Sequence, residues 1–352
     1  MSNQALQKPS AAREYWYDNM KSFLILSVVV GHLISGRFGA ENIEWLYSLK
    51  NLIAVYHMPV FFMISGRFSG TRINKNEWDK VFSKVLVPYL TAEIALLLLC
   101  SALGDSTVSN FYFPRALYGL WYLFNIVVYL FLTPILKRCK WLLPLSFLAA
   151  LLAGFAPAIL PAGIHRLVCY YPFFLFGYYT RSIDYSFMKK PVMRILSVLL
   201  FAVIAVYVFT HYDVINYNLL SINKTYEAVS EVNGKPIAVT VLYLISRYII
   251  AFVFFFIVAG ISPAKENIFT RFGSYSVYIY VLHLIIILAF RYVASEHSLL
   301  LHIDSNFKLV LFLLTSIPLC FILVSKPVRK ATRFFIEPRF DIVKIINTLT
   351  EE

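Results

Sequence analysis

The segment from Asp18 to His32 reads DNMKSFLILSVVVGH, and it decides the fold class because polar side chains lie at both ends of an apolar run. Lys21 and His32 are eleven residues apart. On an α-helix this spacing is about three turns and about 16 Å, so the two side chains point in nearly the same direction. Ionisable side chains that follow an apolar helix into a bilayer usually have a function. The segment therefore predicts a membrane-spanning helix with a functional polar face.

The composition of the whole chain also indicates a membrane protein. Of its 352 residues, 59% are hydrophobic, 17% are aromatic and only 14% are charged, and the mean hydropathy is +0.70. These values exclude an ordinary water-soluble globular protein. Most apolar runs are long enough to cross a hydrocarbon core of about 30 Å. We expect an all-α fold, a polytopic transmembrane helical bundle of about ten spans, near residues 19–36, 47–66, 85–103, 117–136, 141–160, 166–181, 193–211, 237–260, 273–294 and 307–325.

The distribution of basic residues predicts the orientation of this bundle. With both termini cytoplasmic, 23 of the 32 Lys and Arg fall on the cytoplasmic side, in agreement with the positive-inside rule. Topology thus explains the net charge of +13, and we expect no nucleic-acid partner. No cleavable signal peptide is evident, so the first helix should direct insertion. We expect one integral-membrane domain over residues 1–352, with a cytoplasmic N-terminal tail at 1–16, an extracytoplasmic loop at 211–236 and a cytoplasmic C-terminal tail at 326–352.

The four cysteines show no disulfide framework. Cys100, Cys139, Cys169 and Cys320 are scattered in or beside apolar runs, without a CxxC spacing. We interpret them as small core residues, and we expect no metal ion.

Further ionisable residues are predicted at the depth of His32. Measured from the cytoplasmic ends of their helices, His57 lies about 15 Å deep and His283 about 18 Å deep. Glu93 lies about 13 Å deep, and Arg247 enters from the other side. An ionisable residue near the membrane centre costs about 2.5–3.5 kcal/mol. Five such residues at one level therefore predict a shared polar cavity.

These residues also have purely structural interpretations. A single histidine often bonds neighbouring helices, Glu93 and Arg247 could neutralise each other, and His57 could be satisfied at a helix break. His32 is the hardest to explain in this way, because other polar residues share its helix face. A neutral imidazole in a dry cavity can take a proton from a hydroxyl group. That chemistry suits acyl transfer to an alcohol, and it equally suits a proton relay in a transporter.

Several motifs resemble one known family. The spacing from Lys21 to His32 is similar to that family's basic residue, ten others and a histidine in the first helix. The block from His57 to Gly66, HMPVFFMISG, is similar to its second signature. The chain thus resembles the membrane-bound acyltransferase 3 family, especially its fucose O-acetylase-like or polysaccharide O-acetyltransferase branch. Further similar blocks lie at residues 80–84, 87–89, 120–123, 171–178 and 273–283.

The resemblance implies an O-acetyltransferase in the bacterial cytoplasmic (plasma) membrane. It implies acetyl-coenzyme A as the cytoplasmic donor and a hydroxyl of a cell-envelope or capsular glycan as the acceptor, free or lipid-linked. Membrane lipids are further expected partners, and a homodimer is left open. The basic segment 67–84 and Lys21 would attract the phosphates of coenzyme A, although a lysine cannot offer the planar fork of an arginine. The same segment could instead serve topology alone.

Site residues follow from the depth estimates and the resemblance together. We expect His32 to be the general base, with His57 and His283 positioning groups or stabilising the oxyanion. Glu93 could orient a histidine. The expected catalytic residues are Asp18, Lys21, His32, His57, Glu93 and His283; the expected donor-binding residues are Lys21, Arg67, Arg72, Lys80 and Lys84; the expected acceptor-binding residues are Trp121, Tyr122 and Arg247.

Two other functions compete with acyl transfer. A secondary transporter or flippase would move an acyl or glycan species without bond chemistry, but the repeated halves with broken helices that favour it are not evident. An inactive scaffold is disfavoured by the intact motifs around His32 and His57.

Overall fold

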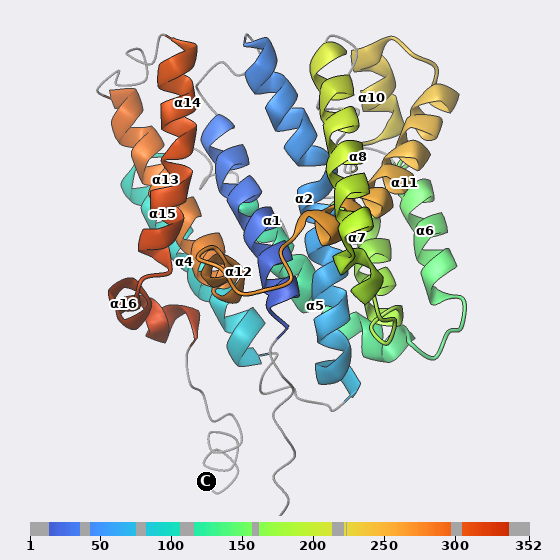
Figure 1. Ribbon diagram of the computed structural model, residues 1–352, viewed down its shortest axis with the longest axis horizontal. Coiled ribbons are helices and arrows are strands. Elements are labelled where there is room, and N and C mark those ends of the chain that lie inside the picture. Colours follow the sequence, from blue (N-terminus) through green and yellow to red (C-terminus); the bar gives the residue numbers. More distant parts are fainter. Residues whose placement is uncertain are drawn as a thin grey trace, which may run out of the picture.

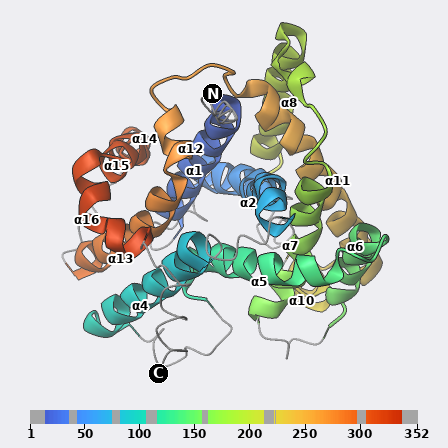
Figure 2. The ribbon, with the colours of Figure 1, turned by 90° about the horizontal axis from the view of Figure 1, so that it is seen from below.

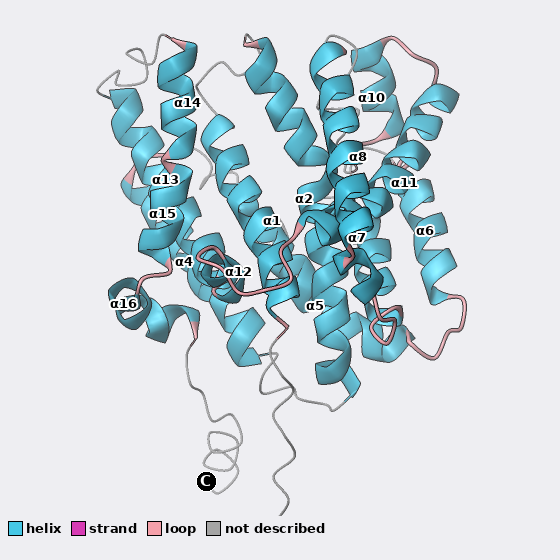
Figure 3. Ribbon diagram, viewed as in Figure 1, coloured by secondary structure: helices cyan, strands magenta, loops and turns pink. Residues whose placement is uncertain are grey.

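The computed structural model describes residues 14–35, 43–74, 82–105, 116–156, 162–212, 222, 224–296 and 305–337. All regular elements in these ranges are helices, and no strand occurs in them (Figure 3). The predicted all-α fold is therefore confirmed. The long helices are α1 (Tyr15–Ile34), α2 (Glu44–Asn74), α4 (Val87–Ala102), α5 (Trp121–Leu136), α6 (Leu142–Ala153), α7 (Ala162–Tyr179), α8 (Pro191–Thr210), α11 (Ile237–Ile261) and α13 (Ser276–Glu296). The short ones are η2 (Phe82–Leu86), η3 (Tyr118–Leu120), η4 (Ser186–Lys189), α10 (Tyr226–Asn233), α12 (Thr270–Ser274), α14 (Asn306–Leu314), α15 (Ser316–Leu323) and α16 (Lys326–Ile336).

The helices α1 and α2 lie in the middle of the bundle (Figure 2). Helices α4 and α5 flank them on one side, α13 to α16 on another, and α6, α7, α8 and α11 on the third. We name the two ends of the bundle from the orientation of Figure 1. The lower face is the end where α1 begins and α2 ends, and the upper face is the end where α2 begins. The helix α1 stops short of the upper ends of α2 and α14 (Figure 1).

Seven helices of the described chain are long and apolar enough to cross a membrane. This confirms a bundle of membrane helices, while the count of ten spans and the cytoplasmic position of the termini stay predictions. The other three predicted spans are helices too, namely α1, α6 and α7. The seven are Glu44–Gly70, Phe82–Ala102, Tyr118–Leu136, Pro191–Thr210, Ile237–Ile261, Ser276–Ala294 and Asn306–Leu323.

Burial differs strongly between the central and the peripheral helices. In the most apolar window of α2, 72% of the residues are buried inside the protein, whereas in α8 only 11% are buried. Val203 and Val206 of α8 are both more than 60% exposed. An apolar helix with so little protein cover is stable where lipid surrounds it. The outer helices therefore form a lipid-facing belt, and the polar residues lie inside it.

The central helix α2 packs on α7 through backbone atoms. A Cβ atom added to Gly66 would lie 1.9 Å from the carbonyl oxygen of Phe174, and one added to Gly177 would lie 1.8 Å from the carbonyl oxygen of Met63. Such close approach is possible because glycine has no side chain. Two reciprocal contacts of this kind fix α2 firmly against α7.

The predicted loop at 211–236 and the predicted tail at 326–352 each contain a helix. In the loop, Thr225 caps α10 by accepting the backbone N–H of Ala228, and Gly234 ends it with a φ of 60°. In the tail, α16 combines basic residues with an apolar end. Both helices are short, so hydropathy alone did not predict them.

All four cysteines are free. Cys100, Cys169 and Cys320 are buried, as predicted for small core residues, but Cys139 is exposed in the turn between α5 and α6. The prediction is wrong for Cys139 because the apolar run of α5 ends at Leu136.

Candidate active site

The two histidines of the sequence motifs line one cavity toward the upper face. This upper cavity has a volume of about 140 Å³. His32 reaches it from the last turn of α1, and His57 reaches it from the middle of α2. The predicted convergence of these two residues is therefore observed in the structure. The cavity is lined by Val28, Gly31, His32, Ser35, Lys50, Ile53, Ala54, His57, Met58, Gly119, Trp121, Arg166, Tyr170 and Tyr280.

An arginine from α13 holds the end of α1 that bears His32. Arg291 donates from Nη2 to the backbone carbonyls of His32 and Ser35. The carbonyls in the last turn of a helix lack partners within the helix, and a cation there also suits the helix dipole. Arg291 thus fixes the position of the His32 backbone, a role that the sequence analysis missed.

His57 is oriented by its own helix. Its Nδ1–H donates to the carbonyl of Ile53 at 2.7 Å, so Nε2 carries the lone pair. The helix continues through Pro59 to Asn74, so the helix break that the structural interpretation requires is absent. A histidine with a fixed tautomer and a free lone pair can accept a proton.

His283 lies behind His32 rather than on the cavity surface. Its side chain is fully buried, and its ring centroid is 5.2 Å from that of His32. Nδ1–H donates to the carbonyl of Ile279 at 2.7 Å. Nε2 has no hydrogen-bond partner among the described residues. His283 is therefore placed to support His32, and it does not line the upper cavity.

A glycine lies directly against His32. A Cβ atom added to Gly119 would lie 3.2 Å from Nε2 of His32 and 3.1 Å from Leu284. The residue before it, Tyr118, has a φ of 45°, a left-handed conformation that non-glycine residues rarely adopt and that is often found at functional sites. The short helix η3, just before α5, thus comes close to the imidazole of His32 because Gly119 has no side chain.

A second, larger cavity opens toward the lower face. This lower cavity has a volume of about 380 Å³. Lys21 of α1 and Lys84 of η2 are its basic residues, and Glu337, after the end of α16, is its acidic one. Its lining consists of Lys21, Ile25, Phe61, Ile64, Ser65, Phe68, Ser69, Lys84, Val85, Tyr122, Leu123, Ile126, Gly273, Ser274, Ser276, Val277, Tyr280, Ile336 and Glu337.

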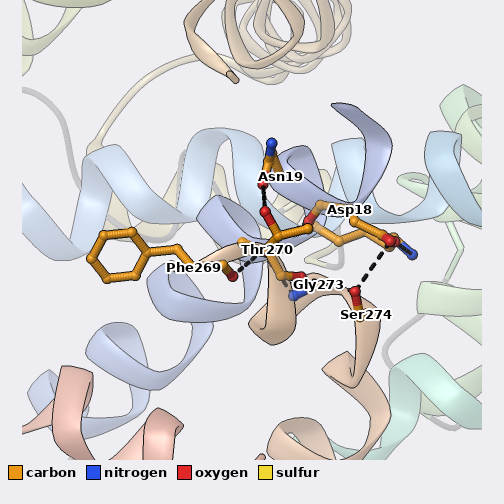
Figure 4. Close-up of polar contacts among 8 residues, drawn as sticks. Asp18, Asn19, Phe269, Thr270, Gly273 and Ser274 are labelled. Carbon is orange, nitrogen blue, oxygen red and sulfur yellow. Dashed lines mark hydrogen bonds and ion pairs between the residues drawn. The ribbon is translucent and has the colours of Figure 1, made fainter. Parts of the chain in front are cut away.

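The cation of Lys21 is positioned by Asp18. Lys21 Nζ lies 2.6 Å from an oxygen of Asp18, and Ser274 of α12 donates to the other oxygen at 3.1 Å (Figure 4). Because an ammonium group has three donors, this pairing leaves Lys21 able to bind an anion in the cavity. The predicted acid and base on one face of α1 therefore form a pair at the entrance to the lower cavity.

The neighbouring residue Asn19 ties α1 to α12. Its Oδ1 accepts from Thr270 at 2.7 Å (Figure 4), and its Nδ2 donates to the carbonyls of Pro263 and Lys265 at 2.7 and 2.9 Å. A Cβ atom at Gly273 would lie 1.7 Å from the carbonyl oxygen of Asp18. The lower part of α1 is thus fixed by α12 and the segment before it, as Arg291 fixes the part that bears His32.

Comparison with known proteins agrees with this arrangement. A family model described as an acyltransferase domain matches residues 14–325. The chain belongs to the acyltransferase 3 family. The resemblance inferred from the motifs is therefore confirmed.

One relative extends the comparison of this acyltransferase 3 chain. This relative is the nodulation protein NolL of Sinorhizobium fredii (strain NBRC 101917 / NGR234), to which the present chain is 27% identical over 214 residues. The matched region covers 55% of the present chain and 56% of NolL, so the chain matches little more than half of that relative. No solved structure matches the chain.

Besides Asp18 and His283, three predicted site residues of the acyltransferase 3 chain line neither cavity. Arg67 does not line the lower cavity, because its guanidinium donates to the carbonyls of Thr180 and Ile183 after α7. The sequence could not show this, since the carbonyls belong to a distant segment. Of the remaining donor-binding candidates, the Arg72 side chain and Lys80 lie outside the described residues.

The other two, Glu93 and Arg247, are buried. Glu93 accepts the backbone N–H of Leu117 at 2.9 Å, so its observed contact is with the segment before α5 and not with a histidine. Arg247 donates to the carbonyl of Ala54 at 2.7 Å, and Ala54 lines the upper cavity. Both residues therefore support the backbone that forms the site.

The two aromatic residues predicted to bind the acceptor, Trp121 and Tyr122, line different cavities. Trp121 lines the upper cavity, where the guanidinium of Arg166 lies 5.2 Å from its ring. Tyr122 lines the lower cavity and shares a hydrogen bond of 2.6 Å with Ser65. Among the described residues, no group of three His, Cys, Asp or Glu side chains could hold a metal ion. The site thus offers imidazoles, ammonium groups and aromatic surfaces.

Proposed function

We propose that this acyltransferase 3 protein transfers an acetyl group from acetyl-coenzyme A to a hydroxyl group of a cell-envelope or capsular glycan. The donor would enter at the lower face, which we assign to the cytoplasm of a bacterium, and the acceptor at the upper face. The observation behind this proposal is that a cavity lined by Lys21 and Lys84 lies below a cavity lined by His32 and His57. Family membership supports acyl transfer as the reaction.

The lower cavity suits the donor because coenzyme A carries several phosphates. Lys21 and Lys84 provide positive charge there, and lysine binds phosphate as a point charge. Asp18 holds Lys21 in place. The apolar lining deeper in the cavity, such as Ile25 and Phe61, suits the less polar arm that bears the thioester. The donor would therefore lie with its phosphates below and its acyl group above.

The upper cavity supplies the base for the reaction. The imidazole of His32 or His57 takes the proton of the acceptor hydroxyl as the oxygen attacks the thioester carbonyl. The new ester O–C bond forms, the C–S bond breaks, and coenzyme A leaves as a thiolate that receives the proton from the imidazolium. An acyl-histidine intermediate is an alternative route through the same residues. Either route needs the histidines at the inner end of the donor cavity.

The first experiment is acetyl transfer by the purified protein in nanodiscs. Radiolabelled acetyl-coenzyme A is offered with a mixture of envelope glycans, and the label on glycan and on protein is counted. We expect His32→Ala to lower transfer by about 10²- to 10⁴-fold, the usual contribution of a general base. His211→Ala is the matched control, because His211 is exposed at the upper end of α8 and lines neither cavity.

Two outcomes would contradict the proposal. Retention of most of the transfer in His32→Ala would remove this residue from the mechanism. If the wild-type protein consumed no thioester with any acceptor but moved a glycan or acyl species across liposomes, the protein would be a transporter.

A further inference from the structure

The residue Tyr280 of α13 is the one described side chain that lines both cavities. It is 6% exposed. Its hydroxyl donates to the backbone carbonyl of Gly119, the glycine that lies against His32. Its ring centroid is 5.4 Å from that of Tyr122, which lines the lower cavity. Tyr280 is therefore held against η3 by this hydrogen bond, and its side chain lies between the two cavities.

The layer that separates the cavities is thin. On α1, Ile25 lines the lower cavity and Val28 the upper one; on α2, Phe61 lines the lower cavity and Met58 the upper one. Each step is three residues, or about 4.5 Å of helix rise. This thickness is comparable to that of one aromatic ring, and the side chain of Tyr280 lines the cavity on each side of the layer.

We infer that Tyr280 is the partition between the donor cavity and the histidines, and that its ring restricts transfer to short acyl groups such as acetyl. This inference rests on the proposed function, because it concerns the passage of the acyl group from one cavity to the other. An acyl group can reach His32 only when the ring turns aside and its bond to Gly119 opens. An acetyl group needs the smallest opening of any acyl group with a carbon substituent.

The same partition keeps water away from the thioester. If water entered from the upper cavity, its oxygen would attack the carbonyl, the C–S bond would break, and acetate and coenzyme A thiol would be released without transfer. A closed aromatic layer excludes water until an acceptor is present, and water exclusion of this kind prevents side reactions. Tyr280 therefore sets both the acyl preference and the coupling of thioester consumption to transfer.

The test compares acetyl-, propionyl- and butyryl-coenzyme A as donors for the full-length protein in nanodiscs. Transfer to glycan is measured with acceptor, and thiol release is measured without it. We expect the wild-type protein to prefer acetyl over butyryl by at least about tenfold, since one methylene group discriminates by about 10- to 200-fold. Tyr280→Ala should reduce this preference to about threefold or less and raise acceptor-independent thiol release.

Three further variants make the test specific. Tyr280→Phe keeps the ring and should keep the acyl preference. Tyr280→Trp enlarges the ring and should slow acetyl transfer by a larger factor than it weakens the equilibrium binding of coenzyme A, which provides a test even if Tyr280→Ala does not fold. Tyr292→Ala is the control, because Tyr292 is an exposed tyrosine of the same helix, and it should behave as wild type.

The outcomes separate this inference from the proposed function. Unchanged acyl preference and thiol release in a folded Tyr280→Ala, or unchanged acetyl transfer in Tyr280→Trp, would overturn the partition. Loss of acetyl transfer in Tyr280→Phe with normal donor binding would also overturn it, because the hydroxyl would then be catalytic. Absence of transfer by the wild-type protein with every donor would instead overturn the proposed function.

Discussion

At position 119 the protein has almost no space for a side chain. The added methyl group of Gly119→Ala would press on Nε2 of His32 and on Leu284, both within 3.3 Å, so the imidazole must move by a few tenths of an ångström. Because a displacement of 1 Å can cost about 10²-fold, we expect kcat for acetyl transfer to fall by roughly tenfold, with little change in KM for the donor.

Steady-state kinetics of Gly119→Ala in nanodiscs check this expectation. Leu284→Ala in the same background removes the second contact but not the contact with His32. It should therefore fail to restore kcat. A normal kcat in Gly119→Ala would show that the glycine serves the backbone alone.

Lys84 is exposed at the entrance of the lower cavity, where water and salt screen its charge. Its contribution to donor binding should therefore be modest. We expect Lys84→Ala to raise KM for acetyl-coenzyme A by about 2- to 5-fold, as for an exposed ion pair, and to leave KM for the acceptor unchanged. The effect should shrink at high salt.

The matched control for this prediction is Lys137→Ala. Lys137 is exposed beyond the end of α5, and it does not line the lower cavity. Equal donor KM values for the two variants would leave Lys84 with a topological role only.

The residues that sequence could predict are those linked by a helical period or by a family motif. The spacing from Lys21 to His32 placed one polar side chain at each cavity, and the motif around His57 added the second histidine. Gly119, Tyr280 and Arg291 were missed because their partners lie far away in the chain; Tyr280 and Gly119, for example, are 161 positions apart. No local pattern encodes such contacts.

At the scale of helices, the α2–α7 contact should be the most sensitive point of the fold. In Gly177→Ala the new Cβ would collide with a backbone oxygen of α2, and backbone cannot turn aside as a side chain can. Overpacking in a close-packed interior costs about 1–3 kcal/mol and occasionally more. We expect a clear fall in the thermal unfolding midpoint in detergent.

Gly31→Ala is the control for stability at a second helical glycine. There the nearest neighbour of the added Cβ, a methyl group of Ile53, lies 3.5 Å away, which is ordinary contact. Its unfolding midpoint should match the wild type. Equal midpoints for Gly177→Ala and the wild type would mean that the two helices separate easily.

Helix existence was easier to predict than helix function. The ten apolar runs all correspond to helices because hydropathy reports burial in lipid or protein. Two short helices escaped this criterion, although Thr225 before α10 and Gly234 after it are capping residues with known preferences. Capping patterns in polar segments therefore add information that hydropathy omits.

For the whole molecule, sequence predicted the fold class and family but not the division of its interior. Composition and charge distribution indicated a helical membrane bundle, and the motifs indicated an acyltransferase. Of the five ionisable residues predicted at a single level, His32 and His57 line the upper cavity, whereas His283, Glu93 and Arg247 are buried and line neither cavity. Helix depth can be counted from sequence, whereas helix rotation and tilt depend on packing.

The glycine contacts between α2 and α7 have a kinetic consequence for the complete protein. Two helices whose backbones lie in contact at Gly66 and Gly177 cannot slide or roll past one another unless they first move apart. Passage of a group from one side of the membrane to the other would then depend on the movement of a small part within a rigid frame of helices. It would not depend on a rocking of whole helices that exposes the centre of the protein alternately to each side.

A covalent tether tests this distinction. A disulfide introduced between facing residues of α2 and α7 should form with little strain, because the two helices lie close together. With Cys139 replaced to avoid side reactions, this disulfide should leave acetyl transfer within about twofold of that of the reduced protein, because turnover does not require the two helices to separate. Inhibition on oxidation, reversed by reduction, would show that turnover requires the two helices to move apart.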